Sequence, residues 1–123
     1  MKLKVKDIDK LVKKGFISKS EKQALDKLIA ELKASWPGVK AKVFGSKVKG
    51  IADDESDLDI LILVPGEVSE ETRRQIIYKV FDINLTYETN LSALIMSEGE
   101  WEGRPTSLLP IHTVIEEEGV HVE

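Results

Sequence analysis

The segment from Asp57 to Val64 constrains the fold of this chain most, because apolar residues occupy both faces of the strand that its pattern predicts. Successive side chains of a strand point to opposite faces. One face therefore carries Asp57, Asp59, Leu61 and Leu63, and the other carries Leu58, Ile60, Ile62 and Val64. A strand that is apolar on two faces is covered on two sides, so we expect other elements to pack against both.

Helical spacing of apolar residues predicts two helices in the first third of the chain. The first covers residues 7–14 and ends at Gly15. The second covers residues 21–35 behind a capping box formed by Ser20 and Gln23. Leucine and isoleucine recur along one side of this second helix, so we expect it to pack on the sheet.

Two further helices follow the apolar strand. Ser69 predicts the start of a helix that runs to about Tyr87. We expect this helix to turn four apolar side chains inward, those of Ile76, Ile77, Val80 and Phe81. A last helix is expected over residues 107–118, ended by Gly119, with Pro110 near its start.

Two more strands complete the predicted sheet. Residues 39–44 place Val39, Ala41 and Val43 on one face, and residues 91–96 form another apolar run. The pattern contains no internal repeat and no low-complexity linker. We therefore expect one α+β domain over residues 1–123, with a short sheet backed by helices.

Composition limits where such a domain works. Hydrophobic residues make up 41% and charged residues 33%, which is typical of a folded globular chain. The absence of cysteine excludes disulfides and thiolate metal ligands and fits a reducing cytoplasm. No apolar run is long enough to span a membrane, and the first ten residues lack the apolar stretch of a secretory signal. We expect a soluble, cytoplasmic protein.

Charge is distributed unevenly along the chain. Residues 1–50 carry a net charge of +9 and residues 51–123 a net charge of −13, which agree with the overall −4. A basic half that meets an acidic half suits a site in which basic residues bind phosphates and acidic residues bind metal ions. No basic stripe interleaved with aromatics is present and the pI is about 5.3, which argues against an extended nucleic-acid footprint.

The turn after residues 39–44 has the composition of a phosphate-binding loop. Gly45 lacks a side chain, so a ligand can approach the backbone closely. The Ser46 hydroxyl adds a hydrogen-bond donor, and Lys47 and Lys49 add positive charge. We therefore name Gly45, Ser46, Lys47 and Lys49 as candidate nucleotide-binding residues.

Asp57 and Asp59 form a candidate metal pair. They lie at the start of their strand on the same face, with alpha carbons roughly 6.6 Å apart. Two unshielded carboxylates this close repel each other and favour a cation between them. Hard oxygen ligands of this kind suit Mg²⁺ or Mn²⁺, which also binds triphosphate oxygens. We name both residues as candidate metal ligands and catalytic residues.

At these residues the sequence resembles the minimal nucleotidyltransferase (MNT) family of the DNA polymerase beta-like nucleotidyltransferase superfamily. The mark of that family is Gly-Ser, a spacer of about this length and Asp-x-Asp on a strand. Residues 45–50 resemble the family loop Gly-Ser-Arg-x-Arg-Gly with lysine in place of arginine, and residues 56–59 resemble its metal strand. The motif covers about residues 39–64, and the order of elements extends the likeness from about 20 to 103.

The resemblance implies a nucleotidyltransferase fold with a short mixed sheet, and a Mg²⁺-dependent enzyme. It would transfer a nucleoside monophosphate, AMP from ATP by our reading, to a hydroxyl acceptor and release pyrophosphate. Two Mg²⁺ ions are implied at Asp57 and Asp59, with Mn²⁺ as an alternative. Small stand-alone members resemble antitoxins of toxin–antitoxin modules whose partner is a HEPN-type ribonuclease. The acceptor would then be that partner, or would be held at the interface of a homo-oligomer.

One position departs from the family pattern. The family usually supplies a third carboxylate from the next strand, whereas residues 90–96 hold no Asp or Glu. Ser92 is our first assignment for this position, Asn90 the second, and Glu88 is the nearest carboxylate. The alternative function is therefore a catalytically weak module that binds a nucleotide or a partner protein.

Overall fold

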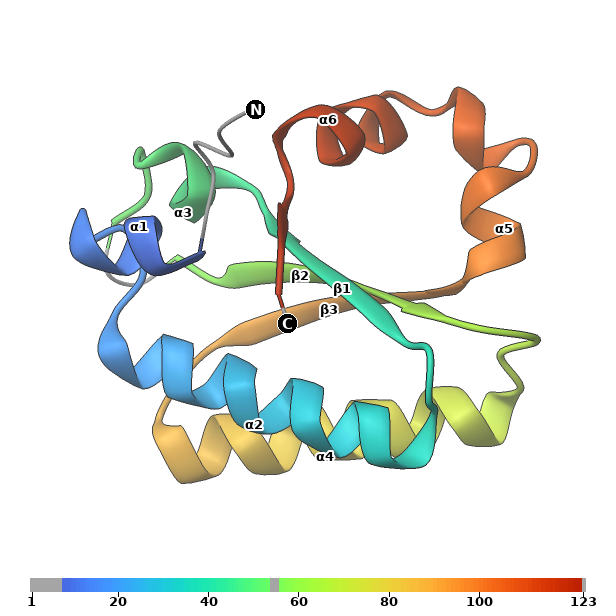
Figure 1. The fold of residues 1–123 in the computed structure, drawn as a ribbon, viewed down its shortest axis with the longest axis horizontal. Helices are drawn as coiled ribbons and strands as arrows, with labels where there is room; N and C mark the ends of the chain where they lie inside the picture. Colours follow the sequence, from blue (N-terminus) through green and yellow to red (C-terminus); the bar gives the residue numbers. More distant parts are fainter. Residues whose placement is uncertain (1–7, 54–55, 123) are drawn as a thin grey trace.

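The sheet at the centre of the fold is mixed. The structure is a computed structural model that describes residues 8–53 and 56–122. In this part of the chain it contains four strands in the order β3-β2-β1-β4. Their bounds are Lys40–Phe44 for β1, Leu58–Val64 for β2, Leu91–Ser97 for β3 and Val120–His121 for β4. β2 runs parallel to β3 and antiparallel to β1, and β4 pairs with β1 (Figure 1). The α+β class and the mixed sheet are confirmed.

Seven helical segments connect and cover the strands in the described residues. They are α1 (Ile8–Lys13), α2 (Lys19–Ser35), α3 (Ser46–Lys49), α4 (Glu70–Tyr87), α5 (Glu98–Glu102), the 3₁₀ turn η1 (Thr106–Leu108) and α6 (Pro110–Glu118). The predicted helices are present, although residue 7 of the first lies outside the described residues. The last helix begins at Pro110 rather than at residue 107, because proline lacks an N–H group and suits the first helical position.

The capping box of α2 lies two residues earlier than predicted. Ser18 precedes the helix, its hydroxyl accepts the N–H of Glu21 at 3.0 Å, and the Glu21 carboxylate accepts the N–H of Ser18 at 2.9 Å. Ser20 lies inside the first turn, where its hydroxyl donates to the carbonyl of Tyr87 at 2.6 Å. The assignment of Ser20 and Gln23 as the capping box is therefore wrong. Ser18 and Glu21 have the same spacing and include the residue types that satisfy both orphan donors.

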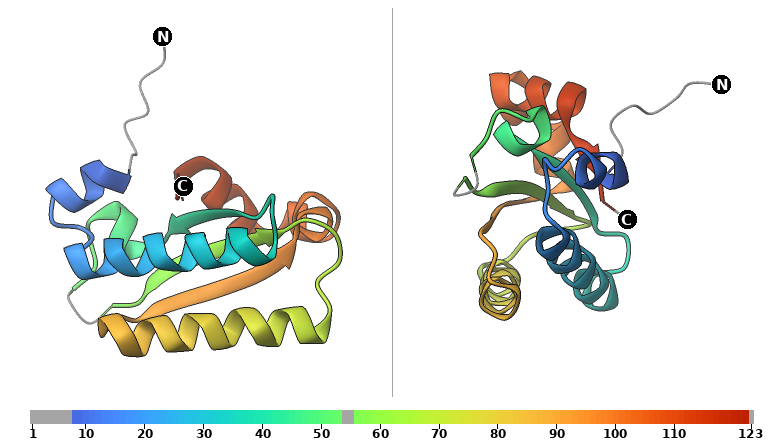
Figure 2. Two further views of the ribbon diagram at one scale, coloured as in Figure 1. Left: turned by 60° about the horizontal axis from the view of Figure 1, so that its bottom comes forward. Right: turned by 90° about the vertical axis from the view of Figure 1, so that its left-hand side faces the viewer.

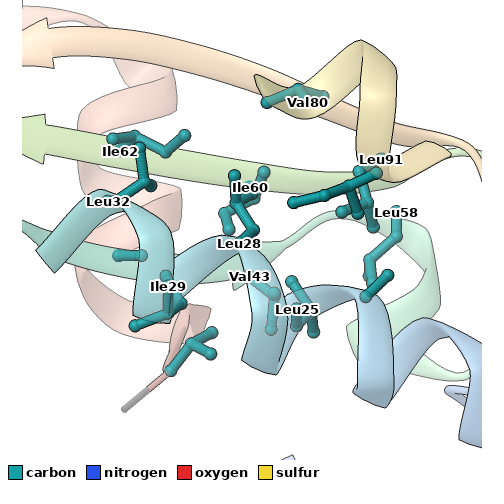
Figure 3. Close-up of a cluster of buried hydrophobic side chains, with 14 of the residues drawn as sticks. Leu25, Leu28, Ile29, Leu32, Val43, Leu58, Ile60, Ile62, Val80 and Leu91 are labelled. Carbon is teal, nitrogen blue, oxygen red and sulfur yellow. The ribbon is translucent and has the colours of Figure 1, made fainter. Parts of the chain in front are cut away.

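The larger core lies between the sheet and the pair α2 and α4, which run side by side below it (Figures 1 and 2). The face of β2 that carries Leu58, Ile60, Ile62 and Val64 contributes to this core. Ala41 and Val43 of β1 are buried in it, together with Val39 just before the strand, as their alternation predicts. Figure 3 shows Leu28 and Leu32 of α2 directed toward Ile60 and Ile62, with Leu25 beside Val43.

The opposite face of β2 supports a second, smaller cluster. Leu61 and Leu63 pack there with Trp101 of α5 and Ile115 of α6. Trp101 is fully buried, and its indole N–H donates to Glu116 at 2.7 Å. β2 is therefore covered on both faces, as its apolar pattern predicts.

Two of the four side chains expected to point inward from α4 do not. Ile76 and Val80 are buried, but Ile77 is 50% and Phe81 59% exposed, so the prediction was wrong for these two. Consecutive helical residues differ by about 100° in direction. A helix that packs along the line Ile76–Val80–Ile83 turns the residue after each of the first two outward. No helix in the described residues is long and apolar enough to span a membrane.

Candidate active site at the start of strand β2

The predicted site residues come together at one end of the strands, where β1 ends and β2 begins. β1 ends there with Phe44, which pairs with Asp59 at the start of β2. On the other side of β2, Asp59 pairs with Ser92 of β3. The antiparallel β1–β2 pairing therefore delivers Gly45 and Ser46, which follow Phe44, to the metal pair, although Asp57 lies 11 positions beyond Ser46 in the sequence.

Asp59 lies on the face of β2 that carries Leu61 and Leu63, and Asp57 directly precedes this strand, which begins at Leu58 rather than at Asp57 as predicted. The side chain of Asp57 is exposed, whereas Asp59 is partly buried. Burial raises the pKa of Asp59 above its ordinary value, and the negative charge of Asp57 raises it further. Both causes disfavour the charged carboxylate, so a cation placed between the two would stabilise it.

Gly45 lies directly against the carboxylate of Asp59. Its φ of +90° belongs to a region that side chains rarely adopt. A methyl group built on its alpha carbon would overlap Oδ2 of Asp59. Glycine is therefore required here both for conformation and for space. The sequence predicts a close approach to the backbone of Gly45, and only the fold reveals its positive φ and that the close neighbour is Asp59.

α3 begins immediately after this contact. Ser46 is its first residue, and the carbonyl of Gly45 accepts the N–H groups of Val48 and Lys49 at 3.2 and 3.3 Å. Gly50 ends the helix in the left-handed conformation. The half-buried Ser46 therefore begins α3 directly after the glycine that contacts Asp59.

The two lysines of the loop make ion pairs within the protein. Lys47 is only 8% exposed, and its ammonium group lies 2.7 Å from Oε2 of Glu21. Because Glu21 also caps α2, this pair ties α3 to the start of α2. Lys49 is more exposed and lies 3.1 Å from Oε1 of Glu118 in α6. Sequence reasoning missed Glu21, although its capping spacing from Ser18 was a signal for a fixed carboxylate.

Three residues were assigned as alternatives for the missing carboxylate, and they differ in position. Ser92 is the residue of β3 that pairs with Asp59, and paired residues of neighbouring strands direct their side chains to the same face. Asn90 precedes the strand and accepts the N–H of Leu58 through its carbonyl at 2.9 Å. Glu88 ends α4 in a left-handed conformation, four positions before Ser92. Ser92 therefore occupies the cross-strand position beside Asp59.

The donor set is compatible with Mg²⁺ in particular. Within residues 8–53 and 56–122, no three His, Asp or Glu side chains gather closely enough to hold a metal by themselves. Mg²⁺ is usually bound by one or two carboxylates and completes its octahedron with water and substrate phosphate oxygens. Asp57 and Asp59 meet that requirement, and the raised pKa of Asp59 marks a carboxylate that lacks a compensating positive charge.

A polar cavity of 390 Å³ lies beside the aspartate pair and does not include it. The buried pair Lys47 and Glu21 lines it together with Phe16, Asp53 and Glu88, among others. Gly45, Ser46, Asp57 and Asp59 are not among its lining residues. The aspartate pair differs from this cavity in having glycine backbone directly against one of its carboxylates, that of Asp59.

Comparisons with known proteins identify the family and support the fold. A family model described as a nucleotidyltransferase domain matches residues 25–108, which include every candidate site residue. The crystal structure of a proposed nucleotidyltransferase from Sulfolobus solfataricus matches 98% of this chain and 89% of its own, with 20% identity and a TM-score of 0.54. At that identity the likeness concerns the fold alone. No curated protein matches the chain.

Proposed function

Because the chain belongs to the nucleotidyltransferase domain family, we propose that it transfers AMP from ATP to a hydroxyl group of a partner protein in a Mg²⁺-dependent reaction. The acceptor oxygen would form a bond to the α-phosphorus while the bond to the bridging oxygen of the β-phosphate breaks. Pyrophosphate leaves with the electron pair of that bond, and the hydroxyl proton passes to a base or to solvent. Such a reaction depends on positioning and charge stabilisation rather than on covalent chemistry by the protein.

The contact between Gly45 and Asp59 is the observation that carries this proposal. It places a stretch of backbone without a side chain against one of two adjacent carboxylates. A triphosphate that lies along this backbone therefore comes next to Asp57 and Asp59. Phosphate binding and metal binding, which the sequence predicts at separate segments, become parts of one site.

Asp57 and Asp59 would hold the Mg²⁺ ions. When bound, these ions neutralise charge on the triphosphate and on the attacking and leaving oxygens. The protein contributes the two carboxylates in fixed positions at the start of a buried strand. Asp59 is fixed on both sides, by its pairing with Phe44 and with Ser92.

The phosphate contacts would come chiefly from Ser46 and the backbone at Gly45. The Ser46 hydroxyl can donate to a phosphate oxygen, and the backbone at Gly45 carries no side chain that would separate the ligand from Asp59. Lys49, which is partly exposed, would exchange Glu118 for phosphate. For Lys47 we propose an indirect contribution, because its ammonium group is already paired with Glu21 and fixes α3 in place.

We propose that the acceptor is a separate macromolecule, by resemblance to MNT proteins a HEPN-type ribonuclease in a toxin–antitoxin pair. Outside residues 25–108, the described chain forms α1, the start of α2, α6 and β4. Val120 and Val122 at its end are buried in the larger core. These segments support the sheet and leave no separate acceptor-binding domain in the described residues.

Incubation with labelled ATP, Mg²⁺ and the protein encoded by the neighbouring gene tests the proposal. We expect label on the partner from ATP labelled at the α-phosphate and none from ATP labelled at the γ-phosphate. Asp57→Asn and Asp59→Asn should abolish the transfer, whereas Asp26→Asn, a carboxylate change on α2, should not. Transfer from the γ-position would overturn the proposal, because it would show a kinase.

A second candidate function is favoured by Ser92. This hydroxyl lies opposite Asp59, where a carboxylate would activate the acceptor and complete a metal site. A protein with this site would bind Mg²⁺–ATP and turn it over slowly, and would act on its partner by contact. ATP binding without transfer to any tested acceptor supports this candidate, and rapid transfer excludes it.

A further inference from the structure

An exposed apolar stripe runs along α4 on the side turned away from the core. It consists of Ile77, Phe81 and Leu85, with Tyr78 beside them. Leu85 is 64% and Tyr78 61% exposed, similar to the values for Ile77 and Phe81. Residues four apart lie on the same face of a helix, so these side chains form one patch. Contiguous apolar patches of this kind mark interaction surfaces.

We propose that a second copy of this chain covers the stripe through an antiparallel pairing of the two α4 helices. Ile77 and Leu85 each lie four residues from Phe81. Rotation about a two-fold axis near Phe81 therefore brings Phe81 against its own copy and Ile77 against Leu85 of the second copy. An isologous interface needs this self-complementary order.

The charges at the two ends of the stripe favour the same register. Arg74 lies seven residues before Phe81 and Glu88 seven residues after it, and both are exposed. Seven residues are nearly two helical turns, so Arg74 lies close to the line of the stripe. Glu88 is the residue at which α4 ends. The antiparallel pairing places Arg74 of each copy next to Glu88 of the other, where Arg74 would exchange its exposed partner Glu71, now at 2.9 Å, for Glu88. A parallel pairing would place like charges together.

The neighbouring edge of the sheet offers a less suitable surface. The Asn90 carbonyl faces β2, so the backbone groups of odd-numbered β3 residues face away from it. Asn84 of α4 bonds both the N–H and the carbonyl of Leu91, and Arg73 of α4 donates to the carbonyl of Ile95 at 2.7 Å. These side chains occupy the edge and hinder pairing with another strand. The helix stripe is therefore a more suitable surface for a second copy than this edge.

The size of the stripe sets the expected affinity. A stable interface buries about 800 Å² on each partner. Four large apolar side chains that are half to two-thirds exposed provide roughly half of that area. We therefore expect a dimer that dissociates in the micromolar range.

The proposed dimer leaves the catalytic residues open. α4 packs on the face of the sheet that carries Ile60 and Ile62, while Asp59 belongs to the other face and Asp57 precedes the strand. Figure 2 shows α4 below the sheet, with α5 and α6 above it. The dimer proposal therefore stands or fails independently of the proposed function.

Sedimentation velocity of the full chain over about 1–500 μM tests the proposal. We expect a concentration-dependent change from monomer to dimer. Phe81→Glu should remain monomeric over the whole range, and Leu108→Glu should still dimerise. Leu108, in η1, is 66% exposed and lies outside α4, so it is a matched control. Both replaced side chains are exposed, and equal melting temperatures would show that both variants fold.

Two further variants test the register. Arg74→Glu should weaken the dimer at least tenfold, and addition of Glu88→Arg should restore it. The chain contains no cysteine, so Phe81→Cys should form a disulfide-linked dimer under mild oxidation while Leu108→Cys should not. A monomeric wild type at the highest concentration would overturn the proposal and leave the stripe to a different partner. A dimer that survives Phe81→Glu would also overturn it.

Discussion

Ser92 lies directly opposite Asp59 across the parallel strands β2 and β3, so a hydroxyl stands beside the partly buried member of the aspartate pair. Neighbouring residues of parallel strands share a face, and this hydroxyl therefore points to the same side as the Asp59 carboxylate. A serine there cannot act as a base at neutral pH and is a weak metal ligand. In the proposed site, ATP could therefore bind although the third carboxylate that would speed its turnover is replaced by a hydroxyl. This suggests a direct test.

Ser92→Asp should raise the rate of transfer to a suitable acceptor by about 100- to 10,000-fold, the range of a general base. Glu88→Gln should change the rate little, because Glu88 lies before β3. Single-turnover kinetics with α-labelled ATP measures both. A large loss in Glu88→Gln, with no gain in Ser92→Asp, would identify Glu88 as the third carboxylate.

Asp57→Asn and Asp59→Asn should each remove Mg²⁺-dependent ATP binding without unfolding the protein. Burial and the charge of Asp57 raise the pKa of Asp59, so its carboxylate destabilises the metal-free fold at neutral pH. We therefore expect Asp59→Asn to melt at the same temperature as wild type or higher in EDTA. Titration calorimetry and thermal melts measure the two effects. Undiminished affinity in both variants would contradict the site assignment.

Ser46→Ala should weaken ATP binding by about 1–3 kcal/mol, the range for a hydrogen bond to a charged group. Ser35→Ala, at the exposed end of α2, is the control and should have no effect. Titration with Mg²⁺–ATP gives both affinities. If Ser46→Ala binds as tightly as wild type, the hydroxyl does not contact the triphosphate.

Lys47 and Lys49 should respond differently to replacement. Lys47→Met leaves the buried Glu21 unpaired and should lower the free energy of unfolding by about 3–5 kcal/mol. Lys49→Met breaks an exposed pair and should cost at most about 1 kcal/mol. Urea unfolding measures the free energy of unfolding of both variants and of wild type. The double variant Lys47→Met/Glu21→Gln should recover part of the loss, because glutamine still caps α2. Loss of ATP affinity in Lys47→Met at unchanged stability would instead show a direct phosphate contact.

The pH dependence of stability should reveal the hydrogen bond between Trp101 and Glu116. The bond from the Trp101 indole lowers the pKa of Glu116, and Lys42 and His112 lower it further. A carboxyl group whose pKa is lower in the folded state stabilises the fold above its unfolded pKa of about 4.3 and loses this effect as pH falls. Wild type should therefore exceed Glu116→Gln by about 1 kcal/mol at pH 7, a value limited by solvent exposure. The difference should vanish near pH 3. A constant difference would show that the carboxylate charge is not involved.

The sequence predicts which residues meet at the start of β2 better than it predicts the outer surfaces of the helices. Gly45 and the two aspartates follow from local rules, because each needs a residue type that few alternatives can replace. The outward position of Phe81 did not follow, since isoleucine and phenylalanine fit a core and a dimer interface equally well. The pairing of Lys47 with Glu21 depends on how α3 meets α2, and no local pattern encodes that contact. The sequence therefore did not predict which charged residues contact each other in the fold.

The two clusters that sandwich β2 differ greatly in size. The larger one includes side chains from α2, α4 and all four strands of the described chain, whereas the smaller one rests on Leu61, Leu63, Trp101 and Ile115. Segments with fewer buried apolar contacts open at lower free energy than the whole protein. Amide hydrogens of α5 and α6 should therefore exchange with solvent before those of α2. The face of β2 that carries Asp59 is therefore covered by the cluster that opens at the lower free energy of the two.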